Sequence, residues 1–125
     1  MNFKNAIFVL LGGGIGSLLR FGISLLLNIQ NKFSLPWSTL VANISSVLIF
    51  LAALYFSDNR SAYSETIRYL ILIGFCGGLS TFSTFSFETA ELIKKGETLI
   101  AVVNILLNNV ICIGMIYMMS IKLKH

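Results

Sequence analysis

Residues 74–88 carry an unusual concentration of polar and aromatic side chains for a stretch that follows the apolar run YLILI. They read GFCGGLSTFSTFSFE, with two adjacent glycines, five serines or threonines, a cysteine, four phenylalanines and a glutamate. Phe82 and Phe85 are three residues apart, so they share one helix face. Their ring edges carry partial positive charge, against which a small anion can lie, although packing alone also explains two phenylalanines at this spacing. Thr81 and Ser83 are predicted to cap the helix that follows the glycines.

Two rows of polar side chains lie in neighbouring apolar segments. The rows are Thr39–Asn43–Ser46, spaced i, i+4, i+7, and Asn104–Asn108–Cys112, spaced i, i+4, i+8. Each row follows one helix face. Amides are costly in hydrocarbon unless they are paired, so both rows must face protein or water. The rows offer amide and hydroxyl donors but no acids, which favours a path for a small anion over a proton or metal-cation relay. Polar contacts between helices are the alternative.

Two charged side chains, Arg20 and Glu88, lie within apolar segments. A charge at membrane depth is paired, extends to the interface or serves a function. For Arg20, anchoring at the interface and attraction of anions at a vestibule remain equally open. Glu88 either accepts hydrogen bonds from hydroxyls or pairs with Arg20. Cys76 and Cys112 have no CxxC spacing and no nearby histidine, so we expect free thiols.

Long apolar segments must position these side chains. Only 11% of the 125 residues are charged, against about 25% in a soluble domain, and the mean hydropathy is +0.86. A membrane span needs about 20 mostly apolar residues. We therefore predict a single-domain, all-α integral membrane protein. Its four transmembrane helices cover Ala6–Leu27, Leu35–Phe56, Thr66–Ile93 and Thr98–Ile121, and the first is too long for a cleaved signal peptide.

The glycines predict that the third helix is broken near its middle, at residues 76–80. Broken backbone at membrane depth is tolerated only where it is buried in protein or lines a cavity. The unwound turn frees carbonyl oxygens, and two such breaks meeting at a twofold axis could hold a small cation such as Na⁺.

The distribution of basic residues gives the chain little orientation in the membrane. One side would carry Lys4, Arg60, Arg68, Lys122 and Lys124, and the other Lys32, Lys94 and Lys95. Five against three, or five against four if Arg20 is counted with the second side, is a weak bias for the positive-inside rule. The chain could therefore insert both ways and form an antiparallel homodimer, although a single topology is equally compatible. The glycine pairs Gly12–Gly16 and Gly74–Gly78 suit helix packing, either within one chain or between two.

Three segments resemble the Fluc, or CrcB-type, fluoride channel family: GGGIGSLLRF (12–21), STLVANISS (38–46) and, most specifically, GFCGGLSTFSTFSFE. The resemblance covers nearly the whole chain. It implies a dual-topology, antiparallel homodimer with two pores, multi-pass in the cell (inner) membrane. Fluoride would leave the cytosol passively, without enzymatic chemistry and without a nucleic-acid partner.

The same resemblance assigns expected roles to individual residues. Backbone carbonyls of Gly77 and Ser80 would hold a structural Na⁺ at the dimer centre. Arg20 and Glu88 would either lie at the vestibule of the path or anchor the helices. The family is expected to have tyrosine and serines at the positions where this chain has Asn104, Asn108 and Cys112. The fluoride path would be lined by Asn43, Phe82, Phe85, Thr39, Ser83, Thr84, Asn104, Asn108 and Cys112.

Two other classes of protein share some of these features. A small proton-coupled multidrug exporter also has four spans and dual topology, but it needs a carboxylate in its first helix, and residues 6–27 contain none. A non-transporting membrane scaffold would use the glycines and asparagines for packing alone. Fluoride efflux from liposomes discriminates the channel from the scaffold.

Overall fold

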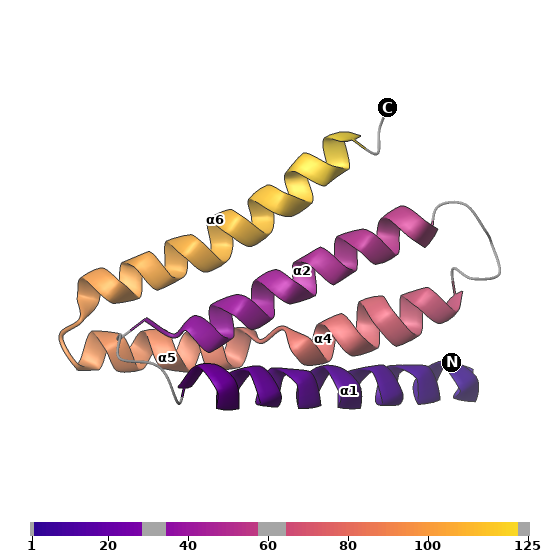
Figure 1. Cartoon of the computed structure of the whole chain (residues 1–125), viewed down its shortest axis with the longest axis horizontal. Helices are drawn as coiled ribbons and strands as arrows, with labels where there is room; N and C mark the ends of the chain where they lie inside the picture. Colours follow the sequence, from indigo (N-terminus) through magenta and orange to yellow (C-terminus); the bar gives the residue numbers. More distant parts are fainter. Residues whose placement is uncertain (1, 29–34, 58–64, 123–125) are drawn as a thin grey trace.

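The described chain forms a layered bundle of helices (Figure 1). The structure, a computed structural model, describes residues 2–28, 35–57 and 65–122. Within these ranges the elements are α1 (Phe3–Asn28), α2 (Trp37–Ser57), the π-helix η1 (Ile67–Phe75), α4 (Cys76–Leu79), α5 (Phe82–Lys94) and α6 (Thr98–Lys122). The predicted connections at 28–34 and 57–65, with Lys32 and Arg60, and the end of the chain with Lys124 lie largely outside the described residues.

Four helical segments of the described chain are long and apolar enough to cross a membrane. They are Phe3–Leu27, Trp37–Phe56, Ile67–Lys94 and Thr98–Lys122. The prediction of an all-helical protein with four membrane-crossing segments is therefore confirmed, and the bounds differ from the predicted ones by three residues or fewer. Pro36 directly precedes α2, whose first residue is Trp37. Proline suits this position because it has no N–H to leave unpaired.

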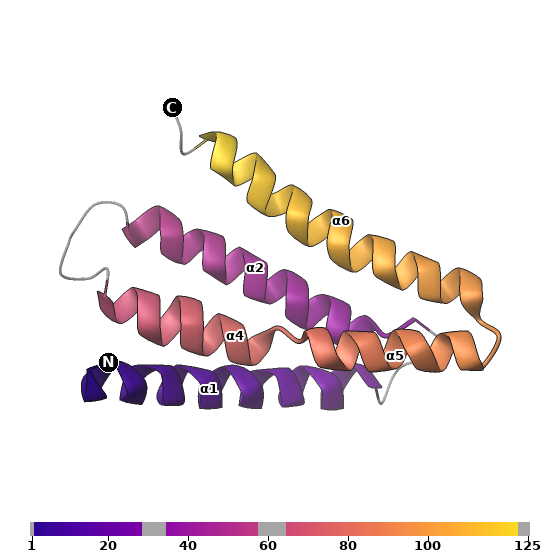
Figure 2. The ribbon, with the colours of Figure 1, turned by 180° about the vertical axis from the view of Figure 1, so that it is seen from behind.

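The layers follow the order α1, then η1 with α4 and α5, then α2, then α6 (Figures 1 and 2). α1 contacts η1 and α4 most extensively, whereas α6 contacts α2 and α5. α6 runs alongside α2, and both diverge from α1 toward the C-terminal end of α6 in both views. Most of the buried side chains are small or polar, which lets the backbones approach closely, and the larger ones are Leu40, Leu79, Phe85 and Leu92.

Glycines set the close approach between α1 and the third segment. A Cβ atom on Gly12 would overlap the carbonyl oxygen of Leu70, and one on Gly16 would overlap that of Phe75. A Cβ on Gly74 would come within 2.9 Å of the Val9 oxygen. The glycine pairs Gly12–Gly16 and Gly74–Gly78 therefore pack against each other within one chain. For these glycines, the choice between packing within one chain and packing between two is thereby decided.

The π-helical register of η1 suits this contact. The two α1 glycines are four residues apart, whereas the carbonyls that they face, Leu70 and Phe75, are five apart. One turn of α-helix spans about four residues, and a π-helix closes its hydrogen bonds from i to i+5. A π-helix thus brings two carbonyls five residues apart onto the line of the two glycines. The sequence predicted only a helix here, and the π-form is a finding of the structure.

The backbone is extended at Ser80 (φ −75°, ψ 156°) and Thr81 (φ −151°, ψ 118°), between α4 and α5. Gly77 and Gly78, expected in the unwound turn at 76–80, lie inside α4. A Cβ on Gly78 would overlap the carbonyl of Gly13, so this glycine serves the contact with α1. Thr81 caps α5 as predicted, because its hydroxyl accepts a hydrogen bond from the Thr84 N–H at 3.2 Å, whereas Ser83, also predicted to cap, lies inside α5.

Candidate functional site

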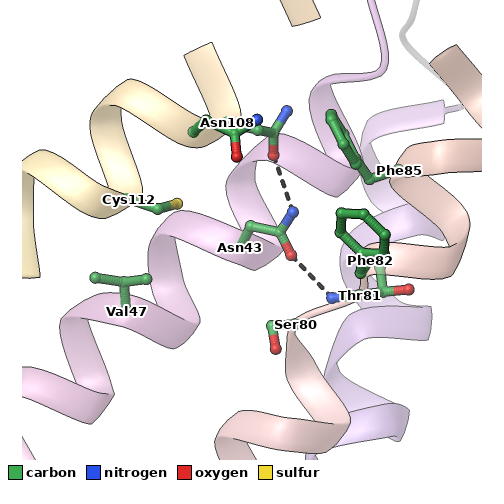
Figure 3. A pocket seen from close by; sticks show the side chains of 9 residues that line it. Asn43, Val47, Ser80, Thr81, Phe82, Phe85, Asn108 and Cys112 are labelled. Atoms are coloured by element: carbon green, nitrogen blue, oxygen red, sulfur yellow. Dashed lines mark hydrogen bonds between the residues drawn. The ribbon is translucent and has the colours of Figure 1, made fainter. Parts of the chain in front are cut away.

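A cavity of about 230 Å³ lies between α2, α6 and the residues around the extended backbone (Figure 3). We call it the Asn43 pocket. Val47 adds an apolar wall from α2. The complete lining is Asn43, Val47, Ser80, Thr81, Phe82, Phe85, Asn108, Asn109 and Cys112. Five predicted path residues are thus brought together: Asn43, Phe82, Phe85, Asn108 and Cys112.

The two phenylalanines form one wall of the Asn43 pocket. Their ring centroids are 5.8 Å apart and the ring planes meet at 44°. Phe85 is only 8% exposed, whereas Phe82 is 79% exposed. Figure 3 shows both rings beside Asn43 and Asn108. The pocket therefore combines ring edges with amide groups, and one of its walls is open in the single chain.

Asn43 joins three helical segments at the centre of the pocket. Its Oδ1 atom accepts a hydrogen bond from the Thr81 backbone N–H at 2.9 Å. Its Nδ2 atom donates to Asn108 Oδ1, also at 2.9 Å (Figure 3). In a continuous helix the Thr81 N–H would instead bond the carbonyl of Gly77. Asn43 therefore satisfies the donor that the extended backbone leaves free.

The second polar row continues inward from the pocket. Asn108 Nδ2 donates at 3.0 Å to both the Asn104 carbonyl and Asn104 Oδ1. Asn104 is fully buried and donates to the Thr89 hydroxyl at 3.0 Å, which in turn donates to the Phe85 carbonyl at 2.7 Å. Asn104 is absent from the pocket lining. The structure thus places the three residues of this row differently: Asn108 and Cys112 line the pocket, and Asn104 lies behind it.

The α2 row contacts the third segment at each of its positions. Thr39 is hydrogen-bonded to the Glu88 carboxyl, and Ser46 donates to the Cys76 carbonyl at 2.9 Å. Together with Asn43, these contacts fasten α2 along α4 and α5. The row thus faces protein, as the cost of burying polar groups in hydrocarbon requires.

A second cavity, of about 220 Å³, surrounds Arg20 and we call it the Arg20 pocket. Its lining is Ser17, Arg20, Phe21, Ser24, Thr39, Thr81 and Thr84. Thr81 also lines the Asn43 pocket, so the two cavities share one lining residue. The ion pair found among residues 2–28, 35–57 and 65–122 is Lys94–Glu91, at 2.8 Å. Within these residues Arg20 is therefore not paired with Glu88.

Glu88 has one satisfied and one unsatisfied carboxyl oxygen. The carboxyl is bonded by Thr39, yet its Oε2 atom is buried without a hydrogen-bond partner among the described residues. Ser83, another predicted path residue, contacts the Thr81 hydroxyl at 3.3 Å and is absent from the linings of both cavities. Thr84 lines the Arg20 pocket.

The carbonyl groups before the extended backbone differ in how many hydrogen bonds they accept. The Cys76 carbonyl accepts from Ser46 Oγ, Ser80 Oγ and Ser80 N. Gly77 is exposed, with open space around the position of a Cβ. In the described ranges no three histidine, cysteine or acidic side chains gather into a cation site. A cation bound here would therefore rely on backbone and hydroxyl oxygens, as a hard ion such as Na⁺ prefers.

The sequence did not predict three of the residues that build the site. Val47 and Asn109 line the Asn43 pocket, and Thr89 accepts the hydrogen bond of Asn104. Asn109 adjoins Asn108 in sequence but falls outside the i, i+4 row. Thr89 lies four residues after Phe85, and this spacing is a detectable signal for a threonine that bonds its own helix. Both cysteines are free, as expected.

Comparison with known proteins finds one matching family model and several relatives that share one name. A family model described as "CrcB-like protein, Camphor Resistance (CrcB)" matches residues 7–120. The chain is 39% identical over 120 residues to the "Fluoride-specific ion channel FluC" of Pyrococcus abyssi (strain GE5 / Orsay), which covers 94% of each chain. It is 40% identical over 110 residues to the protein of the same name from Geobacter sp. (strain M21), with 88% and 89% covered. A third, from Methylobacterium radiotolerans, is 35% identical over 115 residues, with 90% and 80% covered.

Proposed function

This chain belongs to the CrcB-like family, and from that premise we propose that it is a passive channel for fluoride. It is a multi-pass membrane protein and not an enzyme. Fluoride leaves the cytosol down its electrochemical gradient across the cell (inner) membrane. The two other classes, a proton-coupled exporter and a scaffold, have no comparable support among its relatives.

The Asn43 pocket is the observation that carries the proposal. It combines amide N–H groups, hydroxyls and the edges of two phenyl rings within one cavity. Fluoride holds its hydration shell tightly, so passage requires several successive contacts that replace water without binding too strongly. Asn43 offers an N–H group, and Phe82 and Phe85 offer ring edges. Thr39, Ser83, Thr84, Asn104, Asn108 and Cys112 extend or support this path.

We propose that the channel is an antiparallel homodimer with two pores. Phe82 is 79% exposed in the single chain, so one wall of the Asn43 pocket lacks cover. Polar groups such as those of Asn43 and Asn109 are costly against lipid. A second copy closes the groove and shields these groups. The weak bias in basic residues permits both orientations of the chain in the membrane.

Arg20 and Glu88 serve the approach to the path. Arg20 and five hydroxyl-bearing residues surround a cavity that shares Thr81 with the Asn43 pocket. An unpaired guanidinium at this depth attracts anions and raises their local concentration. Glu88 anchors the adjoining wall through its hydrogen bond with Thr39.

Fluoride efflux from liposomes tests the proposed function. Purified protein is reconstituted in vesicles loaded with potassium fluoride, and release is followed with a fluoride electrode after a potassium ionophore is added. Matched vesicles contain potassium chloride. We expect rapid fluoride release and much slower chloride release. A protein that releases no fluoride would be a scaffold, and one that moves organic cations only under a proton gradient would be an exporter.

We further propose that Na⁺ is bound by the backbone carbonyls of Gly77 and Ser80 at the dimer centre. The Thr81 N–H bonds Asn43, which leaves the Gly77 carbonyl without its usual helical donor. Two chains meeting here would supply four oxygens, and the bound ion would hold the copies together. Replacing Na⁺ by N-methylglucamine should lower the thermal stability of the dimer, measured by size exclusion after heating. Equal stability in both salts would contradict this site.

Replacing either pocket phenylalanine by isoleucine should reduce fluoride flux about tenfold, because apolar bulk remains while the aromatic edge is lost. The variants are Phe82→Ile and Phe85→Ile, measured by liposome efflux. Phe87→Ile is the matched control, since Phe87 lies on α5, is 66% exposed and lines neither described pocket. Flux equal to that of the control would remove the ring edges from the path.

A further inference from the structure

Side chains on the wall of the Asn43 pocket and behind it form one directional series of hydrogen bonds, which we call the amide ladder. Its members are Asn43, Asn108, Asn104 and Thr89, and each one donates to an oxygen of the next. Asn43 donates to Asn108 at 2.9 Å, and Asn108 donates to Asn104 at 3.0 Å. Asn104 then donates to Thr89 at 3.0 Å. The ladder joins α2, α6 and α5.

Backbone groups at both ends fix the direction of the ladder. The Thr81 N–H can only donate, so it must meet the oxygen of the Asn43 amide. At the other end, the Phe85 carbonyl can only accept, so the Thr89 hydroxyl must donate to it. Turning over any single amide between these ends would place two donors or two acceptors against each other. The orientation of each amide is therefore determined by the network.

The ladder leaves one amide N–H on the wall of the pocket. Asn108 uses its Nδ2 donors on the two oxygens of Asn104. Asn104 is fully buried behind the pocket. Asn43 lines the pocket and uses only one of its two N–H groups in the described network. The remaining N–H of Asn43 is thus the one donor that the ladder offers to a ligand beside the phenyl rings, whereas Asn109, which also lines the pocket, stands outside the ladder.

We propose that Thr89 and Asn104 are positioning residues that hold the free N–H of Asn43 in the pocket. Neither residue lines the pocket itself. The inference rests on the proposed function, since the aimed donor serves a passing anion. Without the Thr89 hydroxyl, the Asn104 amide has no acceptor and can turn over. Asn108 and Asn43 then keep their orientation only through the Thr81 N–H at the other end of the ladder, and the donor spends less time facing the anion.

Substitutions at Thr89 test the proposal through fluoride efflux. Thr89→Val keeps the side-chain shape but removes the hydroxyl, and we expect flux to fall about tenfold, the effect of one lost buried hydrogen bond. Thr89→Ser keeps the hydroxyl and should retain most of the flux. Thr66→Val is the matched control, because Thr66 makes no capping hydrogen bond through its side chain. If Thr89→Val does not yield folded protein, Thr89→Ala replaces it.

A double-mutant cycle separates positioning from general damage. In an Asn43→Ser background the amide to be aimed is gone, so Thr89→Val should cause no further loss of flux. Equal fold losses in both backgrounds would overturn the proposal. So would wild-type flux in Thr89→Val, or equal losses in the valine and serine variants. A wild-type protein without fluoride flux would instead overturn the proposed function, which keeps the two failures distinct.

Discussion

Replacing Asn43 by aspartate should lower fluoride flux by roughly a thousandfold. The substitution keeps the shape of the side chain and its acceptor for the Thr81 N–H, which now bonds Asn43 Oδ1 at 2.9 Å. It removes the N–H that faces the pocket and sets a carboxylate against the passing anion. Two like charges about 4 Å apart repel by about 4 kcal/mol at an effective dielectric constant of 20. That energy corresponds to about three powers of ten in rate.

The measurement is liposome efflux at neutral pH, with the same chemical change elsewhere as the control. Asn5→Asp places a carboxylate in the first turn of α1, where the helix dipole favours negative charge, and outside both the Asn43 and Arg20 pockets. We expect its flux to match the wild type. Size exclusion should show that both variants assemble alike. Rapid efflux through Asn43→Asp would remove Asn43 from the anion path.

The sequence predicted the elements well because membrane-spanning segments have a strong local signal. Length and hydropathy placed all four segments to within three residues. Helical spacing also placed Phe82 and Phe85 in contact, and it aligned the α2 row with the face that meets the third segment. These features depend only on residues close together in the chain, so periodicity suffices to predict them.

Features that depend on contacts between distant segments could not be predicted. Glycines 77 and 78 suggested the position of the unwound turn, yet the extended residues are Ser80 and Thr81. Their position depends on Asn43, which lies 38 residues away and accepts the Thr81 N–H. The fully buried position of Asn104 likewise depends on α5 through Thr89. The helix spacing indicated which face each residue occupies but not which partner meets it.

Adding one methyl group at Gly12 or Gly16 should destabilise the fold, although alanine is the better helix former. A Cβ atom on Gly12 would overlap the Leu70 carbonyl oxygen and approach the Phe75 nitrogen to 2.9 Å. One on Gly16 would overlap the Phe75 carbonyl and approach the Leu79 nitrogen to 2.9 Å. Backbone atoms cannot rotate aside as a side chain can, so α1 must move away from η1. Overpacking of this kind costs about 1–3 kcal/mol.

Glycines elsewhere on α1 give matched controls for this prediction. A Cβ on Gly14 or Gly22 meets no described atom within 4 Å, so alanine there gains helix propensity, about 1 kcal/mol, without a clash. We therefore expect Gly12→Ala and Gly16→Ala to lower the thermal midpoint of the purified protein, and Gly14→Ala and Gly22→Ala to preserve or raise it. The comparison isolates the contact, because all four variants make the same change on the same helix. Equal midpoints in the two pairs would show that α1 does not approach η1 this closely, and the alignment of Leu70 and Phe75 with the glycines would then fail with it.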